Sequence, residues 1–315
     1  MQASLPGAKM PRTSILHKSA ANGSLLISFS ALLWATDALV RFHAIDKVDP
    51  TMIVLIEHIL AVLVMIPLII NKFGKEAFAL SPQQWIASAL TGFGGSALAL
   101  VYFTASFAYV NPSVAVLLQK FQPVMVVVIA FFILGERPNS KFYFWSIIAL
   151  AAGVVLSFPN LDFNFINSVD LHSKGIRYAL LAALMWAIST VAGKILLKKT
   201  SPTLATFWRF FFGLVGLSFI SIFSENHSTS FNWALLSSGS TPWALLYLSL
   251  VPGLLAIFMY YSGLARTTAS IATFVELVYP IGAVILNTLF LHTPLEPIQL
   301  ASGFVLIAAV TLISI

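Results

Sequence analysis

A lysine flanked by two glutamines stands out in one long apolar segment of this sequence. Gln119, Lys120 and Gln122 come directly before Pro123, within the apolar run 112–134. A charged side chain at the centre of a bilayer costs about 2.5–3.5 kcal/mol on insertion scales, so such a residue is rare and a candidate for function. Proline inside an apolar helix frees a backbone carbonyl that can face a polar cavity. We therefore predict that Lys120 and its two glutamines line a polar site inside the protein.

Three other charged residues in the apolar segments are related by spacing. Glu57 and Arg209 are 152 residues apart, and Glu276 lies 157 residues after Gln119. Two acids and two bases near one interface can neutralise each other, or they can bind the carboxylate and ammonium groups of a zwitterion. We predict that Glu57, Arg209 and Glu276 join Lys120 at a substrate site. A purely structural clamp between Glu57 and Arg209 is the alternative.

Aromatic and proton-coupling candidates complete the predicted site. Trp34 and Trp186 are also 152 residues apart and could form aromatic walls for a substrate, although ordinary packing would repeat them too. Glu57 and Glu276 are candidates for protonation during turnover. Burial favours the neutral form of a carboxylate, whereas a nearby cation favours its charged form.

The composition shows what must hold these residues. Of 315 residues, 59% are hydrophobic and only 9% are charged, against about 25% charged in a soluble domain. Runs of about 17–25 apolar residues can cross a bilayer. The sequence predicts an all-α membrane protein with ten such spans: 23–42, 51–71, 84–108, 112–134, 142–158, 175–197, 203–223, 242–264, 268–291 and 297–315.

Several function classes are disfavoured. Gly74-Lys75 lacks both the preceding glycine and the following Ser or Thr of a P-loop, which argues against ATP-driven transport by this chain alone. There is no cysteine, no HExxH and no nucleophile elbow. The net charge of +6 comes from basic residues that punctuate apolar runs and form no stripe. We expect no metal, cofactor or nucleic-acid partner.

Lysine and arginine also predict the orientation. If ten spans are threaded in order, one side carries most of the basic residues: Lys9, Arg12, Lys18, Lys72, Lys75, Arg137, Lys141, Lys198, Lys199 and Arg266. The opposite side keeps Arg41, Lys47, Lys174 and Arg177. Because cytoplasmic loops are rich in these residues, both termini are predicted to lie in the cytoplasm.

The chain repeats itself. Gly23-x7-Ala-Leu-x-Trp34-Ala recurs 152 residues later at Gly175, and the stretch from Ser113 to Pro123 is matched 157 residues later. The predicted units are a cytoplasmic tail (1–22), a first repeat (23–158), a loop (159–174) and a second repeat (175–315). Five spans per repeat is an odd number, so the two repeats are predicted to be inverted. Inverted repeats are typical of alternating-access secondary transporters.

These motifs resemble a known family. Ala-Leu-x-Trp-Ala in the first span of each half, and N-P-S-x-A…P…GE over Asn111–Glu136, resemble EamA-type members of the drug/metabolite transporter superfamily. The resemblance covers the chain from Gly23 to Ile315, although His292-Thr293 stands where the second half would carry Gly-Glu. It implies an inner-membrane permease, commonly an exporter of amino acids, related metabolites or drugs, that works by alternating access and often by proton exchange. It supplies no catalytic motif, so the site residues rest on the charge argument.

Two other classes stay open at this point. An intramembrane enzyme acting on lipid-linked substrates would need acids, histidines or a phosphate pocket at one interface, whereas the candidates here lie within spans. A passive channel is compatible with an inverted repeat. The expected partners are a small-molecule substrate, such as an amino acid or similar metabolite, and the surrounding membrane lipid. Substrate identity, direction, coupling ion and oligomeric state are not determined by the sequence.

Overall fold

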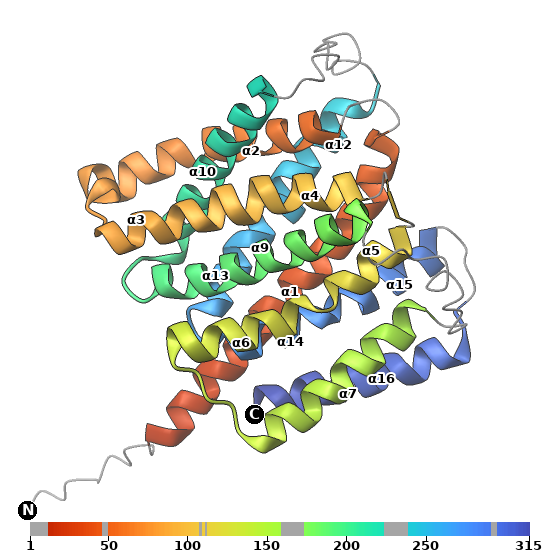
Figure 1. Cartoon of the computed structure of the whole chain (residues 1–315). Helices are drawn as coiled ribbons and strands as arrows, with labels where there is room; N and C mark the ends of the chain where they lie inside the picture. Colours follow the sequence, from red (N-terminus) through yellow and green to blue (C-terminus); the bar gives the residue numbers. More distant parts are fainter. Residues whose placement is uncertain are drawn as a thin grey trace, which may run out of the picture.

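The structure, a computed structural model, is a bundle of long apolar helices (Figure 1). It describes residues 12–45, 50–106, 109–110, 112–158, 173–223, 239–290 and 295–315. Within these ranges, nine helical segments are long and apolar enough to cross a membrane, and a further helix of 34 residues precedes them. The protein is an all-helical, multi-pass membrane protein.

The first half contains five helical rods, two of which are divided into shorter segments. They are α1 (Arg12–Ile45), α2 (Pro50–Phe73) with the 3₁₀ turn η1 (Gly74–Phe78), the rod of α3 (Pro82–Ala89), η2 (Leu90–Leu98) and α4 (Ala99–Ser106), the rod of α5 (Pro112–Gln119) and α6 (Gln122–Leu134), and α7 (Ser140–Ser157).

The second half has the same order of rods. They are α9 (Lys174–Leu197), α10 (Pro202–Phe223), the rod of α12 (Thr241–Leu248), η3 (Ser249–Leu255) and α13 (Ala256–Leu264), the rod of α14 (Ala269–Val275), η4 (Glu276–Val278) and α15 (Tyr279–Phe290), and α16 (Pro297–Ser314).

Helix ends follow local sequence. Ser81 caps α3, with Pro82 in the first turn and Gln84 completing a capping box. Asn139 accepts a hydrogen bond from the backbone N–H of Phe142 and so caps α7. Gly135 ends α6 in the left-handed conformation at φ 70°, which glycine adopts without a steric penalty.

The two halves pack into each other. α1 lies against α13 and α15 of the second half, and α9 correspondingly lies against α4 and α6 of the first. The pairs α2 with α10 and α7 with α16 bring equivalent helices together, and α6 meets α14 of the equivalent rod. Exchanging the halves therefore exchanges the main contacts of α1 with those of α9, as expected of a pseudo-two-fold arrangement.

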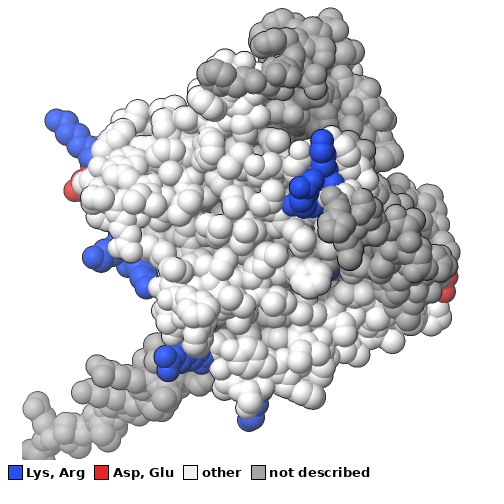
Figure 2. All heavy atoms as spheres, viewed as in Figure 1, with Lys and Arg blue, Asp and Glu red and all other residues white. Residues whose placement is uncertain are grey.

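The outer surface is apolar except at the helix ends. Large hydrophobic side chains on several rods are exposed, including Phe132 at 76%, Ile147 at 69% and Phe304 at 71%. In Figure 2, Lys and Arg side chains project at several places along the left edge, with another group toward the opposite end. α1 begins and α16 ends at that left edge (Figure 1). The apolar band between charged ends is the surface expected of a protein in lipid.

The helices depart from the predicted spans in two respects. α1 begins at Arg12, although the first span is predicted from residue 23, so the helix extends over residues 12–22 as well. The third and eighth rods each contain a π-helical segment, and the fourth and ninth rods are interrupted near their middle. The hydropathy of these segments is continuous, so it cannot show where backbone hydrogen bonding changes.

Candidate functional site

The interruptions of the fourth and ninth rods are related by the sequence repeat. Lys120 and Phe121 form a turn between α5 and α6, and the 3₁₀ turn that starts at Glu276 separates α14 from α15. Pro123 and Pro280 follow in the first turn of α6 and α15, 157 residues apart. Proline is tolerated in a first turn but blocks a continuous helix through it. Gln119, Lys120, Gln122 and Glu276 thus all lie at or beside a break.

The π-helical segments are also related by the repeat. Residues 92–98 of η2 and 249–255 of η3 are 157 residues apart. η2 packs against α10, and η3 packs against α2, the equivalent helix of the other half. Such bulges occur frequently at functional sites. Here they widen the rods that lie beside Arg209 and Glu57.

Each repeated tryptophan packs against an aromatic ring of the other half. The ring centroids of Trp34 and Tyr260 are 5.5 Å apart, and those of Trp186 and Phe103 are 5.3 Å apart. Tyr260 lies 157 residues after Phe103, so the two pairs are equivalent under the repeat. All but Tyr260 are half-buried.

Arg209 is held by residues of its own half. Its Nη1 donates to the hydroxyl oxygens of Ser189 at 3.1 Å and of Tyr261 at 3.3 Å. The guanidinium lies 5.8 Å from the centre of the Tyr261 ring, within cation–π range. α10 approaches η2 closely here, since a Cβ added at Gly92 would lie 2.5 Å from the Arg209 carbonyl oxygen. The glycine in η2 therefore allows the close packing that places Arg209.

Glu276 lies near this arginine in the described network. Both Tyr260 and Arg209 are close enough to its carboxylate to influence it electrostatically. The Tyr260 hydroxyl also lies 3.3 Å from Thr190 Oγ1. Within the described ranges, the carboxylate oxygen Oε1 of Glu276 is buried and has no hydrogen-bond partner. A buried oxygen left without a donor is costly, so it is a natural place for a donor from a ligand or for a proton.

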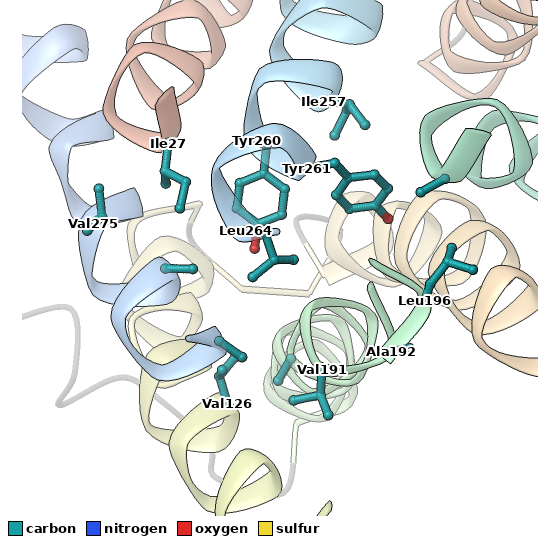
Figure 3. Packing of buried hydrophobic residues seen from close by; sticks show 14 of the residues in the cluster. Ile27, Val126, Val191, Ala192, Leu196, Ile257, Tyr260, Tyr261, Leu264 and Val275 are labelled. Carbon is teal, nitrogen blue, oxygen red and sulfur yellow. The ribbon is translucent and has the colours of Figure 1, made fainter. Parts of the chain in front are cut away.

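The surroundings of these tyrosines are apolar. Figure 3 shows Tyr260 and Tyr261 projecting from α13 into the cluster that contains Ile27 of α1 and Val191 of α9. Tyr260 and Tyr261 are 3% and 0% exposed. Charges in such surroundings interact strongly, because little water is present to screen them.

The other two charged candidates have different environments. Lys120 is largely enclosed by protein. In the described part of the chain, its ammonium forms no hydrogen bond and no ion pair, and so does not pair with Glu57 or Glu276. Glu57 is buried in α2, and its backbone carbonyl accepts a hydrogen bond from Ser249 of η3. The structure thus brings Glu276 close to Arg209 and gives Lys120 no counter-charge among the described residues.

Two residues of this network were not anticipated from the sequence. Ser189 and Thr190 hold Arg209 and Tyr260, but isolated hydroxyl residues in an apolar helix carry no distinctive pattern. Their position three and four residues after Trp186 is the only available signal. The described residues contain no group of three or more His, Cys, Asp or Glu that could hold a metal ion.

Comparison with known proteins identifies the family. The model of the EamA-like transporter family matches residues 21–158 and again residues 173–315. The chain belongs to the EamA-like transporter family. It is therefore a membrane transporter, and not an enzyme, which confirms the family resemblance seen in the sequence and removes the enzyme alternative. The two matches agree with two repeated halves.

Several relatives cover much of this transporter. A riboflavin transporter, ImpX, of Fusobacterium nucleatum subsp. nucleatum is 28% identical over 300 residues, covering 93% of this chain and 97% of that protein. Protein PecM of Dickeya dadantii is 24% identical and covers 90% of each chain. The inner membrane transporter YhbE of Escherichia coli K12 is 22% identical over 188 residues, 58% of this chain and 57% of that protein.

A solved crystal structure has the same fold. It superimposes with a TM-score of 0.73 at 16% sequence identity, covering 93% of this chain and 96% of that chain. At this identity the likeness supports the helical arrangement alone.

Proposed function

We propose that this EamA transporter is an alternating-access secondary transporter of a small polar metabolite, built from ten transmembrane helices in two inverted five-helix repeats. The observation that carries the proposal is the pair of helix breaks at 120–121 and 276–278, which are related by the repeat and lie in equivalent rods. Discontinuous helices at a repeat interface commonly form the substrate sites of secondary transporters. Residues 23–158 and 175–315 form the two repeats in this proposal.

The reciprocal packing of the halves supports inversion. α1 and α9 each insert against the third and fourth rods of the opposite half, so each half completes the other. An odd number of spans per half requires opposite orientations in the membrane. The excess of Lys and Arg at the end where α1 begins and α16 ends supports cytoplasmic termini. The inner membrane is the expected location.

The substrate site is proposed at the two breaks and the aromatic pairs. Lys120, without a counter-charge among the described residues, offers a cation and Glu276 Oε1 offers an acceptor. The other proposed contacts are Gln119, Gln122, Glu57, Arg209, Trp34 and Trp186. A substrate with an acceptor at one end and a donor at the other fits this pattern.

Two substrate classes have that pattern. An amino acid or related metabolite presents a carboxylate and an ammonium group. The riboflavin transporter of Fusobacterium suggests a flavin, whose planar ring system could stack on Trp34 or Trp186 and whose carbonyl and imide groups are acceptors and donors. The aromatic pairs at 5.3–5.5 Å favour testing flavins alongside amino acids.

Counterflow in proteoliposomes tests the function. Vesicles loaded with unlabelled candidate, either riboflavin or an amino-acid mixture, should accumulate the labelled compound transiently above its outside concentration. Such overshoot requires a carrier that exchanges substrate, and a passive channel does not produce it. Absence of overshoot for every metabolite class, with correctly folded protein, would refute secondary transport.

Proton coupling through Glu57 or Glu276 is part of the proposal. An imposed pH gradient should drive accumulation, and Glu276→Gln or Glu57→Gln should abolish the drive while exchange at equal pH continues. A transport rate that ignores the gradient, together with a full rate in both glutamine variants, would refute coupling through these residues.

A further inference from the structure

Glu136 makes an unusual set of contacts between the two halves. It follows Gly135 at the end of α6, and its carboxylate reaches the start of α14 in the second half. Oε1 accepts from the backbone N–H of Ala269 at 2.8 Å, and Oε2 accepts from the N–H and the hydroxyl of Ser270 at 2.9 and 2.6 Å. Hydrogen bonds to an ionised carboxylate at a helix N-terminus are the strong kind.

Lys194 of α9 holds the preceding residues of the same connection. Its ammonium donates to the backbone carbonyls of Leu264 at 2.8 Å, Ala265 at 3.4 Å and Thr267. These carbonyls belong to the end of α13 and the short link to α14, where a cation is favoured. Glu136 is also within electrostatic reach of Lys194. Lys194 therefore binds carbonyl groups of the 264–270 connection, and Glu136 binds its N–H groups.

The two charged residues of this arrangement, which we call the 136–194 clasp, are not repeated in the sequence. The positions equivalent to Glu136 and Lys194 are Thr293 and Phe42, at spacings of 157 and 152. Neither side chain carries a charge, although Ser113 is retained as the equivalent of Ser270. The two charged residues of the clasp are therefore present in only one copy of the sequence repeat.

The clasp joins two half-helices that end at the breaks. α6 starts after the break at Lys120, and α14 ends at the break that begins with Glu276. Each half-helix thus has a charged contact at its outer end and a turn at its inner end. Such turns can absorb backbone rotation, so α6 and α14 could separate at the clasp without unwinding the rest of the rods.

We propose that the 136–194 clasp is the gate that closes the substrate pathway at the end of the bundle carrying Arg137, Lys198 and Arg266. This inference rests on the proposed alternating-access mechanism. The clasp must open for substrate to pass at this end, and it biases the resting protein toward the state closed there.

Spin labels can test the gate because the chain has no cysteine. Ser140 and Arg266 are exposed at the clasp end. Arg266 lies in the 264–270 connection, but neither its side chain nor that of Ser140 makes one of the clasp hydrogen bonds. Labels on Ser140→Cys and Arg266→Cys should give a distance distribution in reconstituted protein, measured by double electron–electron resonance, dominated by the short, closed population. Glu136→Gln and Lys194→Gln should each raise the ratio of the long to the short population roughly tenfold.

Glu296→Gln is the matched control. Glu296 is the N-cap residue of α16 at the opposite end of the bundle, and its capping contacts lie within its own helix. This variant should leave the 140–266 distribution unchanged. A second label pair on Lys174→Cys and Ser240→Cys, both exposed at the opposite end, should shorten or stay constant in Glu136→Gln.

Two results would overturn the gate. One is an unchanged 140–266 distribution in both Glu136→Gln and Lys194→Gln, in protein that elutes as a single folded species. The other is an equal shift in Glu296→Gln, which would indicate general loosening. Because the distances are measured without substrate, this test of the gate is independent of the counterflow assay. An unchanged distribution with intact counterflow would reject the gate alone.

Discussion

Replacing Gly95 by alanine should displace the residue that holds Arg209. Gly95 lies in the π-helical segment η2, facing α9. A Cβ added there would lie 2.5 Å from the Cβ of Ser189. Carbon atoms pack favourably at about 3.5–4.0 Å, so the two must separate by at least about 1 Å. Ser189 can rotate its hydroxyl away, but its Cβ is fixed by the backbone, and α9 itself must move.

The expected cost follows from this displacement. Forcing an extra carbon into a well-packed interior typically costs about 1–3 kcal/mol. Gly94→Ala is the matched control, because an added Cβ at the neighbouring glycine would meet nothing within 4 Å. Removing glycine from a helix stabilises it by roughly 0.5–1 kcal/mol, so Gly94→Ala should be neutral or slightly stabilising.

Two measurements separate the outcomes. Thermal unfolding in detergent, followed by tryptophan fluorescence, should show Gly95→Ala melting several degrees below Gly94→Ala, roughly as these energies imply. Counterflow should fall in Gly95→Ala and persist in Gly94→Ala, because only the first moves Ser189 away from Arg209. If the two variants melt within about 1 °C of each other and exchange substrate equally, the close-approach argument is wrong.

Three further predictions concern individual polar contacts. Lys120→Met should leave the melting temperature unchanged or raised, because it removes a buried charge that has no partner among the described residues. Counterflow should fall at least about tenfold in this variant. A lower melting temperature would instead indicate a structural role. Arg209→Lys should raise the KM for exchange, because one ammonium cannot reproduce the guanidinium contacts to Ser189 and Tyr261; an unchanged KM would argue that Arg209 is remote from substrate. Gln84→Leu should lower the melting temperature by the equivalent of about 1–2 kcal/mol without changing KM, since it leaves the hydroxyl of Thr200, now bonded at 2.7 Å, without its donor.

Most of the architecture can be predicted from the sequence because the bilayer imposes it. Each membrane crossing needs a long apolar helix whose backbone N–H and C=O groups form hydrogen bonds within that helix. Hydropathy therefore locates the rods. The repeat spacings alone relate Glu57 to Arg209 and Trp34 to Trp186. The prolines that follow Lys120 and Glu276 indicate that the two helices are irregular. They do not show that a turn interrupts each rod.

Partners across helices are decided only by the tertiary structure. The side chain of Arg209 binds Ser189 and Tyr261, and Lys120 meets no carboxylate among the described residues. The charged residues in the sequence suggest that acids of one half pair with bases of the other. They do not reveal the contacts of Arg209 with hydroxyl groups, because serine and tyrosine in an apolar helix look like ordinary packing residues.

The contacts of Glu136 and Lys194 show the same limit most clearly. Lys194 lies near the end of an apolar run, and nothing in the sequence shows that it donates to backbone carbonyls at the end of α13. In the sequence Glu136 is only part of a turn motif, yet it accepts from backbone N–H groups of the other half. Every residue but proline has both of these backbone groups, so no sequence pattern marks the ones that a distant side chain will bind. The sequence determined the rods, their repeat and their charged residues, and the packing of one half into the other decided which groups meet.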